Sequence, residues 1–266
     1  MRSIGVIVIL AVAITLSISM LIARDAVNSK INSVKASSGT TANVAPKGFF
    51  GFNGGGTPLK QTKIDTLLDL KNVTSLQVAL SEQLSSSTSN LTSPTPTGSL
   101  GGRFPGAGNA NAGTGSTGQA FTIPIRVIGT NSPGNALVGG ANGGGTEKLT
   151  SGKAFAPTSK ADVAIVGASL AAKNKLSVGS TFTAWKTTIT VVGIYNSGST
   201  FADSDVLMPL ATVQRLASAT NQVTSATVVV NNIDNVASVD KAITKTLGST
   251  ADVTSTQSTI QTQLSL

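Results

Sequence analysis

The sequence ADVAIVGASLAAKNKLSVGSTF, residues 161–182, begins with an apolar run and changes its character within a few residues. Val163–Val166 consists of small and β-branched apolar side chains, which favours a buried strand. The chain turns at Gly167, and from Leu170 the sequence is typical of a helix. Ser169 therefore stands at a sharp strand-to-helix turn, where one class of hydrolases carries its nucleophilic serine.

The residues around Ser169 argue against catalysis. The hydrolase motif needs glycine two positions after the serine, and this chain has Ala171 there. The hydroxyl also needs a base to take its proton, and the chain has no histidine. Lys173 and Lys175 remain as partners for a Ser–Lys pair, but Lys173 lies on a helix face predicted to be exposed. We therefore predict that the chain is not an enzyme, that Ser169 is an N-cap or first-turn residue, and that Gly167 allows the turn.

Composition argues against metal and cofactor sites as well. The absence of cysteine and histidine removes thiolate ligands and the commonest metal ligand. The carboxylates are few and scattered, and we interpret the closest pair, Asp203 and Asp205, as surface turn residues. The glycine-rich segments 51–56 and 139–145 lack the lysine of a phosphate-binding loop, so we expect no cofactor. Phe49, beside the first of them, belongs to an aromatic cluster that is either core or a contact surface.

The charge is basic but thinly spread. The net charge is +8, yet only 11% of the residues are charged, and one Trp and one Tyr offer no stacking platform for bases. We therefore expect no nucleic-acid partner. Serine, threonine, asparagine and glycine fill the places of charged residues, which is common in proteins that face the outside of a cell.

The amino-terminal segment predicts a membrane anchor. Residues 4–23 carry no charge over 20 positions, enough to cross about 30 Å of hydrocarbon. A cleaved signal peptide is the alternative, but its apolar run is usually about 7–15 residues and ends at a small-x-small site, whereas Leu21 occupies that place here. We interpret residues 1–23 as an uncleaved transmembrane anchor that holds the protein in the cell membrane with a single pass.

Beyond the anchor we predict a stalk helix over residues 24–37. Val27, Ile31 and Val34 recur at helical spacing and form one apolar stripe, which favours a partner helix beside it. More positive charges follow the anchor than precede it, which by itself would place the body of the chain on the cytoplasmic side. Long domains, however, translocate largely regardless of such charges. We expect the bulk of the chain to be extracytoplasmic.

A strand–helix–strand pattern then occurs twice. The sequence predicts the first over residues 40–45, 60–70 and 73–84, and the second over residues 226–230, 235–247 and 252–256. Two such units form a split βαβ, ferredoxin-like sheet. We assign residues 38–84 and 221–258 to this lobe.

The second helix of this pattern has the clearest periodicity. Four apolar residues share one face of the helix predicted over residues 235–247: Val236, Val239, Ile243 and Leu247. Gly248 follows at the place of a C-cap.

The middle of the chain differs in composition. Residues 85–118 are rich in Ser, Thr, Pro and Gly, which predicts a flexible loop. Residues 119–220 alternate apolar and polar side chains in several short runs, including a hairpin over 181–195, and predict an inserted, mostly β lobe. Residues 259–266 are predicted to begin a second stalk. The expected fold class is therefore α+β, with a transmembrane helix, a split βαβ lobe and an inserted β lobe.

Residues 162–218, DVAIVGASLAAKNKLSVGSTFTAWKTTITVVGIYNSGSTFADSDVLMPLATVQRLAS, resemble the MacB-like periplasmic core domain of ABC transporter permeases of the FtsX-like type. The positions that carry the resemblance are Val163–Gly167, Leu170, Ala171, Leu176, Gly179, Thr190–Ile194, Asp205–Leu210 and Gln214–Leu216. The order of features, from anchor through stalk and βαβ to an inserted lobe and βαβ again, extends the resemblance along nearly the whole chain.

The resemblance implies an extracytoplasmic domain that transmits conformational change during ATP-driven export or membrane extraction of a substrate. It also implies three partners: a cytoplasmic ABC ATPase subunit, the remaining permease segment and a second copy of the chain in a homodimer. The sequence stops where the second stalk begins, so we expect a permease truncated after its outer domain. A membrane-tethered binding or structural module without an ATPase is the alternative.

Overall fold

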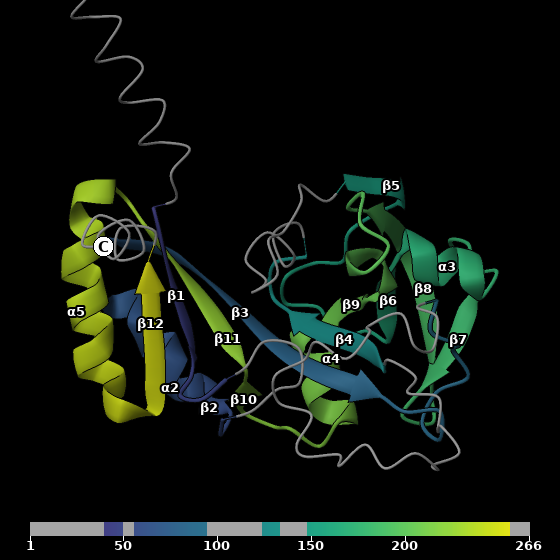
Figure 1. Cartoon of the computed structure of the whole chain (residues 1–266), viewed down its shortest axis with the longest axis horizontal. Coiled ribbons are helices and arrows are strands. Elements are labelled where there is room, and N and C mark those ends of the chain that lie inside the picture. Colours follow the sequence, from purple (N-terminus) through teal and green to yellow (C-terminus); the bar gives the residue numbers. More distant parts are fainter. Residues whose placement is uncertain (1–39, 50–55, 95–123, 134–147, 256–266) are drawn as a thin grey trace, which may run out of the picture.

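The computed structural model describes residues 40–49, 56–94, 124–133 and 148–255. In these residues the fold is mixed α+β, which confirms the class expected from the sequence. One ten-stranded sheet runs through the described chain in the order β12-β1-β11-β3-β4-β9-β6-β8-β5, with β7 also paired to β8 (Figure 1). A second, two-stranded sheet joins β2 and β10.

The strands are β1 (Thr41–Pro46), β2 (Leu59–Lys60), β3 (Val73–Leu84), β4 (Ile125–Thr130), β5 (Lys148–Gly152), β6 (Val163–Gly167), β7 (Thr181–Ala184), β8 (Thr187–Asn196), β9 (Val206–Pro209), β10 (Gln222–Val223), β11 (Ser225–Val230) and β12 (Ala251–Ser255). The α-helices are α2 (Gln61–Asp65), α3 (Ala168–Lys173), α4 (Leu210–Leu216) and α5 (Val236–Leu247). Short 3-10 turns are η2 (Thr66–Asp69), η3 (Ala202–Ser204), η4 (Ile233–Asn235) and η5 (Gly248–Thr250).

The predicted anchor, residues 1–23, and both predicted stalks, residues 24–37 and 259–266, lie outside the described residues. Among the helices that the structure does describe, none has the length and apolarity needed to cross a bilayer.

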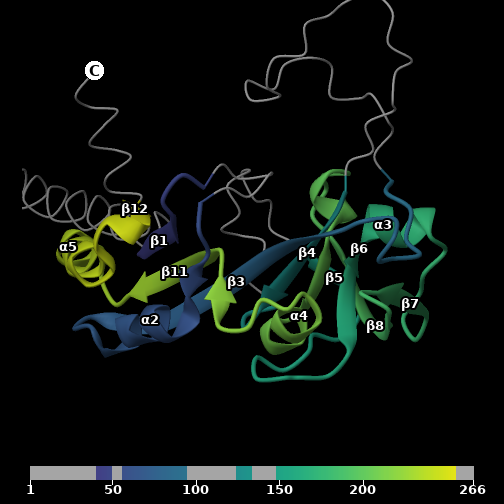
Figure 2. The same ribbon diagram turned by 90° about the horizontal axis from the view of Figure 1, so that it is seen from below.

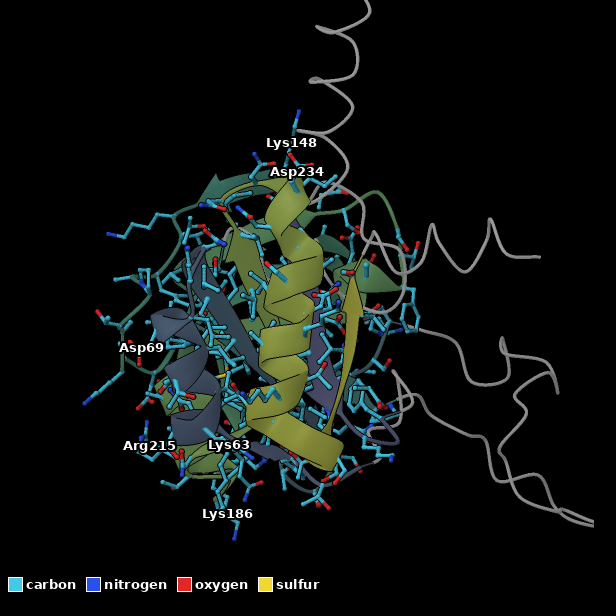
Figure 3. The ribbon with its side chains drawn as sticks, turned by 90° about the vertical axis from the view of Figure 1, so that its left-hand side faces the viewer. Lys63, Asp69, Lys148, Lys186, Arg215 and Asp234 are labelled. Carbon is cyan, nitrogen blue, oxygen red and sulfur yellow. The ribbon has the colours of Figure 1, made fainter. Side chains whose placement is uncertain are left out.

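Four antiparallel strands and two helices form what we call the split unit: β12, β1, β11, β3, α2 and α5. Their order in the sheet, β12-β1-β11-β3, follows from two βαβ connections, one through α2 and η2 and one through α5. Alternate side chains of β1 and β11 are buried in one core with those of both helices, because successive residues of a strand point to opposite faces. Figure 3 shows α5 lying along this layer.

The periodicity of α5 is confirmed. The four residues predicted on its apolar face are each at most 1% exposed, and Gly248 ends the helix with a φ of 62°. A positive φ is one that glycine adopts without steric cost.

Between β3 and β11 the chain leaves the split unit for residues 124–220, which we call the inserted region. Here the sheet is mixed, because β4 runs parallel to β9 and β6 runs parallel to β8, while β9 is antiparallel to β6. In its described residues the inserted region shares one sheet with the split unit, since β4 pairs with β3 over six residues. Figure 2 shows the long strand β3 passing from the side of α2 and α5 to the side of α4.

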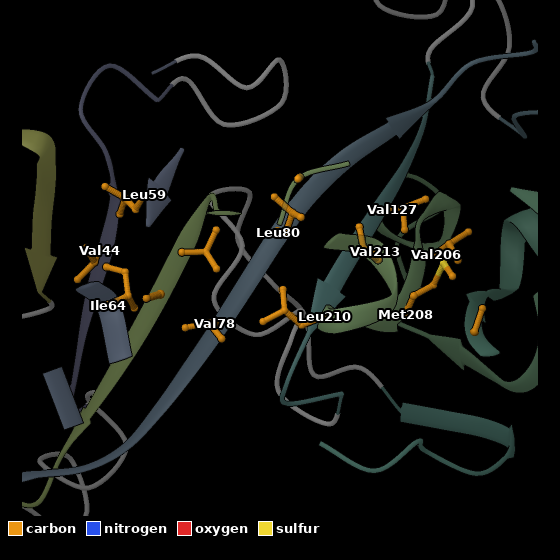
Figure 4. Packing of buried hydrophobic residues seen from close by; sticks show 14 of the residues in the cluster. Val44, Leu59, Ile64, Val78, Leu80, Val127, Val206, Met208, Leu210 and Val213 are labelled. Carbon is orange, nitrogen blue, oxygen red and sulfur yellow. The ribbon is translucent and has the colours of Figure 1, made fainter. Parts of the chain in front are cut away.

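One hydrophobic core crosses the boundary between the two parts. Figure 4 shows Val44 and Ile64 of the split unit, Leu80 of β3, and Val213 and Met208 of the inserted region as members of one buried cluster. All five are at most 1% exposed. A shared core and a shared strand thus join the two parts.

The segment predicted to be a flexible loop begins with ordered contacts. Residues 85–94 are described, and the rest of that segment lies outside the described residues. The Thr92 N–H donates to Asn174 Oδ1 at 2.7 Å, and the Asn174 amide donates back to the Thr92 carbonyl at 2.9 Å. Asn90 Oδ1 accepts from the Thr183 N–H at 2.8 Å. The start of the segment is therefore fastened to α3 and β7.

The predicted hairpin is β7 and β8, joined by Trp185 and Lys186. Both residues have positive φ, 46° and 65°. Two-residue hairpin turns commonly need positive φ at both positions, which is why Asn-Gly is the usual sequence. Here a tryptophan and a lysine adopt that conformation, at a cost in backbone strain.

Candidate functional site: the junction between the two parts

The chain returns from the inserted region to the split unit through residues 221–224, and the contacts there form the junction. β10 pairs with β2, so the returning chain lies against the segment that leads into α2. A motion between the two parts would have to change the contacts of this junction as well as those of the shared strand β3, so the junction contacts contribute to how stiffly the parts are joined.

Asn221 caps the start of α2. Its main-chain carbonyl accepts from the Gln61 N–H, and its side-chain Oδ1 accepts from the Thr62 N–H, both at 2.9 Å. The N-cap residue of α2, Lys60, provides no side-chain cap. Asn221 has a φ of 60°, a conformation that asparagine tolerates better than most residues. A residue 159 positions away thus satisfies the free N–H groups of the first turn.

A glutamine links α4 to both sides of the junction. Gln214 Nε2 donates to Gln61 Oε1 at 2.8 Å and to the Gln222 carbonyl at 3.0 Å. Gln214 stands on α4 of the inserted region, whereas Gln61 begins α2 of the split unit.

Side chains also complete the hydrogen bonding of β3 where its partner changes. Thr224 Oγ1 accepts from the Ser81 N–H at 2.8 Å. Asn131 Oδ1 accepts from the Val78 N–H at 2.9 Å, and the Asn131 amide donates to the Leu76 carbonyl at 3.2 Å. Because hydrogen bonds to a backbone restrict its local opening, the junction resists bending at this point.

Beside the junction, the inserted region buries an ion pair. Arg126 on β4 donates to Asp205, with Nε 3.0 Å from Oδ2 and a second contact through Nη2. Asp205 is only 4% exposed. Burial raises the pKa of its carboxyl above the ordinary 3.8; the Arg126 charge opposes this rise, and Asp203 adds to it. A buried carboxylate needs such a cation, because isolated burial of a charge is costly.

A tightly packed loop precedes Asp205. Asp203 Oδ1 accepts from the N–H of Ser197 at 2.7 Å and from its hydroxyl at 2.8 Å. The Tyr195 hydroxyl donates to the Ala202 carbonyl at 2.6 Å. A Cβ at Gly167 would lie 2.3 Å from the Asp203 carbonyl oxygen, so only glycine fits at this close approach.

Two sequence interpretations of these residues change. Asp203 and Asp205 are not surface turn residues; each is 4% exposed, because one is bound by a neighbouring loop and the other by Arg126. Gly167 is needed for space and not for the turn, because its φ of −67° is open to any residue.

Ser169 is the second residue of α3, and Gly167 is its N-cap. The first-turn interpretation of Ser169 is confirmed, and the N-cap interpretation is wrong. Lys173 and Lys175 are exposed. Phe49 is half-buried, while the rest of its aromatic cluster lies outside the described residues. Within the described ranges, no three acidic side chains gather to hold a metal.

The comparison with protein families identifies the chain. The model of the MacB-like periplasmic core domain matches residues 3–246, so the chain belongs to that family. This is the family that the sequence resemblance indicates. No curated protein sequence matches the chain.

Solved structures share the fold at low sequence identity. The periplasmic region of MacB from Actinobacillus actinomycetemcomitans has a TM-score of 0.58 and 15% identity, covering 85% of this chain and 94% of that one. The extracellular domain of the noncanonic ABC-type transporter YknZ from Gram-positive bacteria has a TM-score of 0.51 and 14% identity, covering 80% and 99%. At such identities the likeness establishes the fold alone.

Proposed function

We propose that this chain is the extracytoplasmic domain of a membrane-anchored ABC transporter permease component. In this role it transmits conformational change during ATP-driven export of a substrate or its extraction from the membrane. Membership of the MacB-like family supports the proposal. The proposal assigns no catalytic residue, cofactor or metal to the domain.

The observation that carries the proposal is the position of the two ends of the described chain. β1 and β12 are antiparallel neighbours in which Ala42 is paired with Ser255. The chain therefore enters and leaves at the same end of two adjacent strands, an arrangement suited to a domain between two membrane-attached segments. A relative movement of those segments would act directly on β1 and β12.

The sheet supplies a path for such a movement. From β12 to β5 the sheet contains nine strands side by side, which span roughly 38 Å at the usual strand spacing of about 4.8 Å. Because β3 belongs to both parts and the junction is fastened by side chains, a tilt at β1 and β12 carries the inserted region with it. We propose that the domain acts as one stiff lever whose parts are the lobes predicted over residues 38–84 with 221–258 and over residues 119–220.

The proposed partners are a cytoplasmic ABC ATPase subunit, the remaining permease segment and a second copy of the chain. Residues 4–23 would anchor the domain in the cell membrane with a single pass, and residues 24–37 would form the stalk. The bulk of the chain would face the outside.

Co-purification tests this function. The tagged full chain, extracted from its native membrane in mild detergent, is expected to bring an ABC ATPase subunit and a second membrane subunit in fixed ratio. A carboxy-terminal tag is expected to be accessible from outside intact cells. Recovery of the chain alone would contradict the proposal and would favour a tethered binding module. A tag accessible only after lysis would contradict the topology.

A further inference from the structure

The two parts of the domain differ sharply in charge. The described residues of the inserted region hold eight cations and three acids, a net charge of +5; those of the split unit hold six of each, a net charge of zero. The eight cations are Arg126, Lys148, Lys153, Lys160, Lys173, Lys175, Lys186 and Arg215, and the three acids are Asp162, Asp203 and Asp205.

The three acids among the described residues of the inserted region are already engaged. Asp205 pairs with Arg126, and Asp162 pairs with Arg215. Asp203 is buried and bound by Ser197. The six lysines that remain are all exposed, and none forms an ion pair with a described residue. Within the described part of the chain these six lysines are therefore uncompensated, and their charges face the solvent.

These lysines are spread over the inserted region instead of gathering at one point. They lie on β5 and the segment that follows it, at the end of α3, and at the β7–β8 turn, elements that Figure 1 shows together at the far end from α5. Within that end, Figure 3 shows Lys148 and Lys186 at opposite extremes. A bilayer or the flat acidic surface of a folded partner would contact the lysines on only one side of the inserted region. A flexible chain can instead bend around the region and contact all six lysines.

The residue type supports a diffuse attraction. Lysine is a compact, hydrated point charge without the planar fork by which arginine fixes one anion in one geometry. The field of several such charges raises the local concentration of anions within a Debye length, about 10 Å at 0.1 M salt. We propose that the inserted region binds a linear, flexible polyanion, in which anionic groups repeat along a chain, through its six uncompensated lysines.

Binding of fluorescent long-chain polyphosphate tests this proposal with the full chain in non-ionic detergent. Polyphosphate supplies only repeated anionic groups, so its affinity reports the electrostatic contact itself. The salt dependence of binding counts the contacts, with a slope of log K against log salt of about −0.7 for each anion neutralised on a flexible strand.

Two variants with the same change in net charge show which of the two parts contributes to polyphosphate binding. The first carries Lys→Gln at four exposed positions of the inserted region: Lys153, Lys160, Lys173 and Lys175. The second carries Lys→Gln at four exposed positions of the split unit: Lys47, Lys60, Lys71 and Lys241. The first is expected to weaken binding at least about tenfold and to make the salt slope shallower by up to about 3. The second is expected to stay within about twofold of the parent.

Equal losses in the two variants would overturn the proposal, because they would reflect net charge alone. Failure of the parent chain to bind at about 0.05 M salt, where screening is weak, would overturn it too. Free orthophosphate at the same phosphate concentration is expected not to compete. With the full chain reconstituted in nanodiscs of uncharged or of anionic lipid, loss of polymer binding in the anionic nanodiscs alone would identify a bilayer as the partner and would contradict the proposal.

Discussion

In the described residues of the split unit, positively and negatively charged side chains are equal in number, and two helices bury their apolar faces on an antiparallel sheet. In the inserted region, a mixed sheet encloses the Arg126–Asp205 pair and a loop packed against Gly167, and lysines cover the outside. The split unit depends on helix burial, which periodicity specifies locally. The inserted region depends on pairs of residues that are remote in sequence. Substitutions should therefore cost most where such remote pairs are buried.

The largest effect is expected from Arg126→Met. It leaves Asp205 buried without its cation, which costs about 3 kcal/mol of unfolding free energy at neutral pH. The pKa of Asp205, already raised by burial, rises further in this variant. A folded-state pKa above the unfolded value of 3.8 means that stability falls as pH rises from 3.8 through the folded pKa. The loss should thus be greatest at pH 7 and smaller near pH 4, as measured by urea unfolding.

The matched control is Arg126→Met combined with Asp205→Leu. Replacing both partners removes the buried charge, so the double variant should recover much of the lost stability and lose the added pH dependence. If the double variant is less stable than the single one, the ion pair is not the cause.

Gly167→Ala should destabilise the chain by about 2 kcal/mol, since the new Cβ forces the Asp203 backbone away. The expected readout is a lower thermal midpoint. In the comparison variant Gly179→Ala the added Cβ meets no atom within 4 Å, so this variant measures only the cost of a φ of +92°. If Gly167→Ala leaves the midpoint unchanged, the loop is not packed as described.

Asn221→Ala tests the junction and should cost about 2 kcal/mol, of which about 1 is the usual value of a lost helix cap and about 1 is the strain of holding alanine at a φ of 60°. Because the Asn221 side chain binds the Thr62 N–H, hydrogen exchange should accelerate at the Thr62 amide, whereas Gln61 keeps its bond to the main-chain carbonyl. Asn232→Ala, which removes the cap of η4 within the split unit, is expected to leave the Thr62 amide unchanged. Unchanged exchange in Asn221→Ala would contradict the role of Asn221.

The smallest expected effect is an increase in stability. Lys186→Gly should stabilise the inserted region by about 0.5 kcal/mol, because glycine adopts positive φ without the cost that lysine bears. The measurement is a small rise in the urea midpoint. Thr188→Gly, in the adjoining strand, should instead destabilise. A loss of stability in Lys186→Gly would show that the lysine side chain itself contributes to the hairpin.

Features that depend on residues close together in the sequence could be predicted, and features that depend on residues far apart in the sequence could not. The apolar face of α5 and its glycine cap could be predicted, because both depend on neighbours within one helix. Asp203 and Asp205 could not, because the cation that permits burial of Asp205 is 79 residues away. Nothing near Asn221 in the sequence indicates that it caps a helix 159 positions earlier. The only local sign of the loop was Gly167, which was interpreted as a turn.

The central claim is that the split unit and the inserted region move as one stiff body. The chain has no cysteine, so two introduced cysteines give uniquely placed spin labels. Lys241→Cys on α5 with Lys173→Cys on α3 spans the two parts, and Lys241→Cys with Lys71→Cys stays within the split unit. In the full chain, we expect one narrow distance distribution across the parts, as narrow as within the split unit. A broad or two-peaked distribution across the parts alone would contradict it.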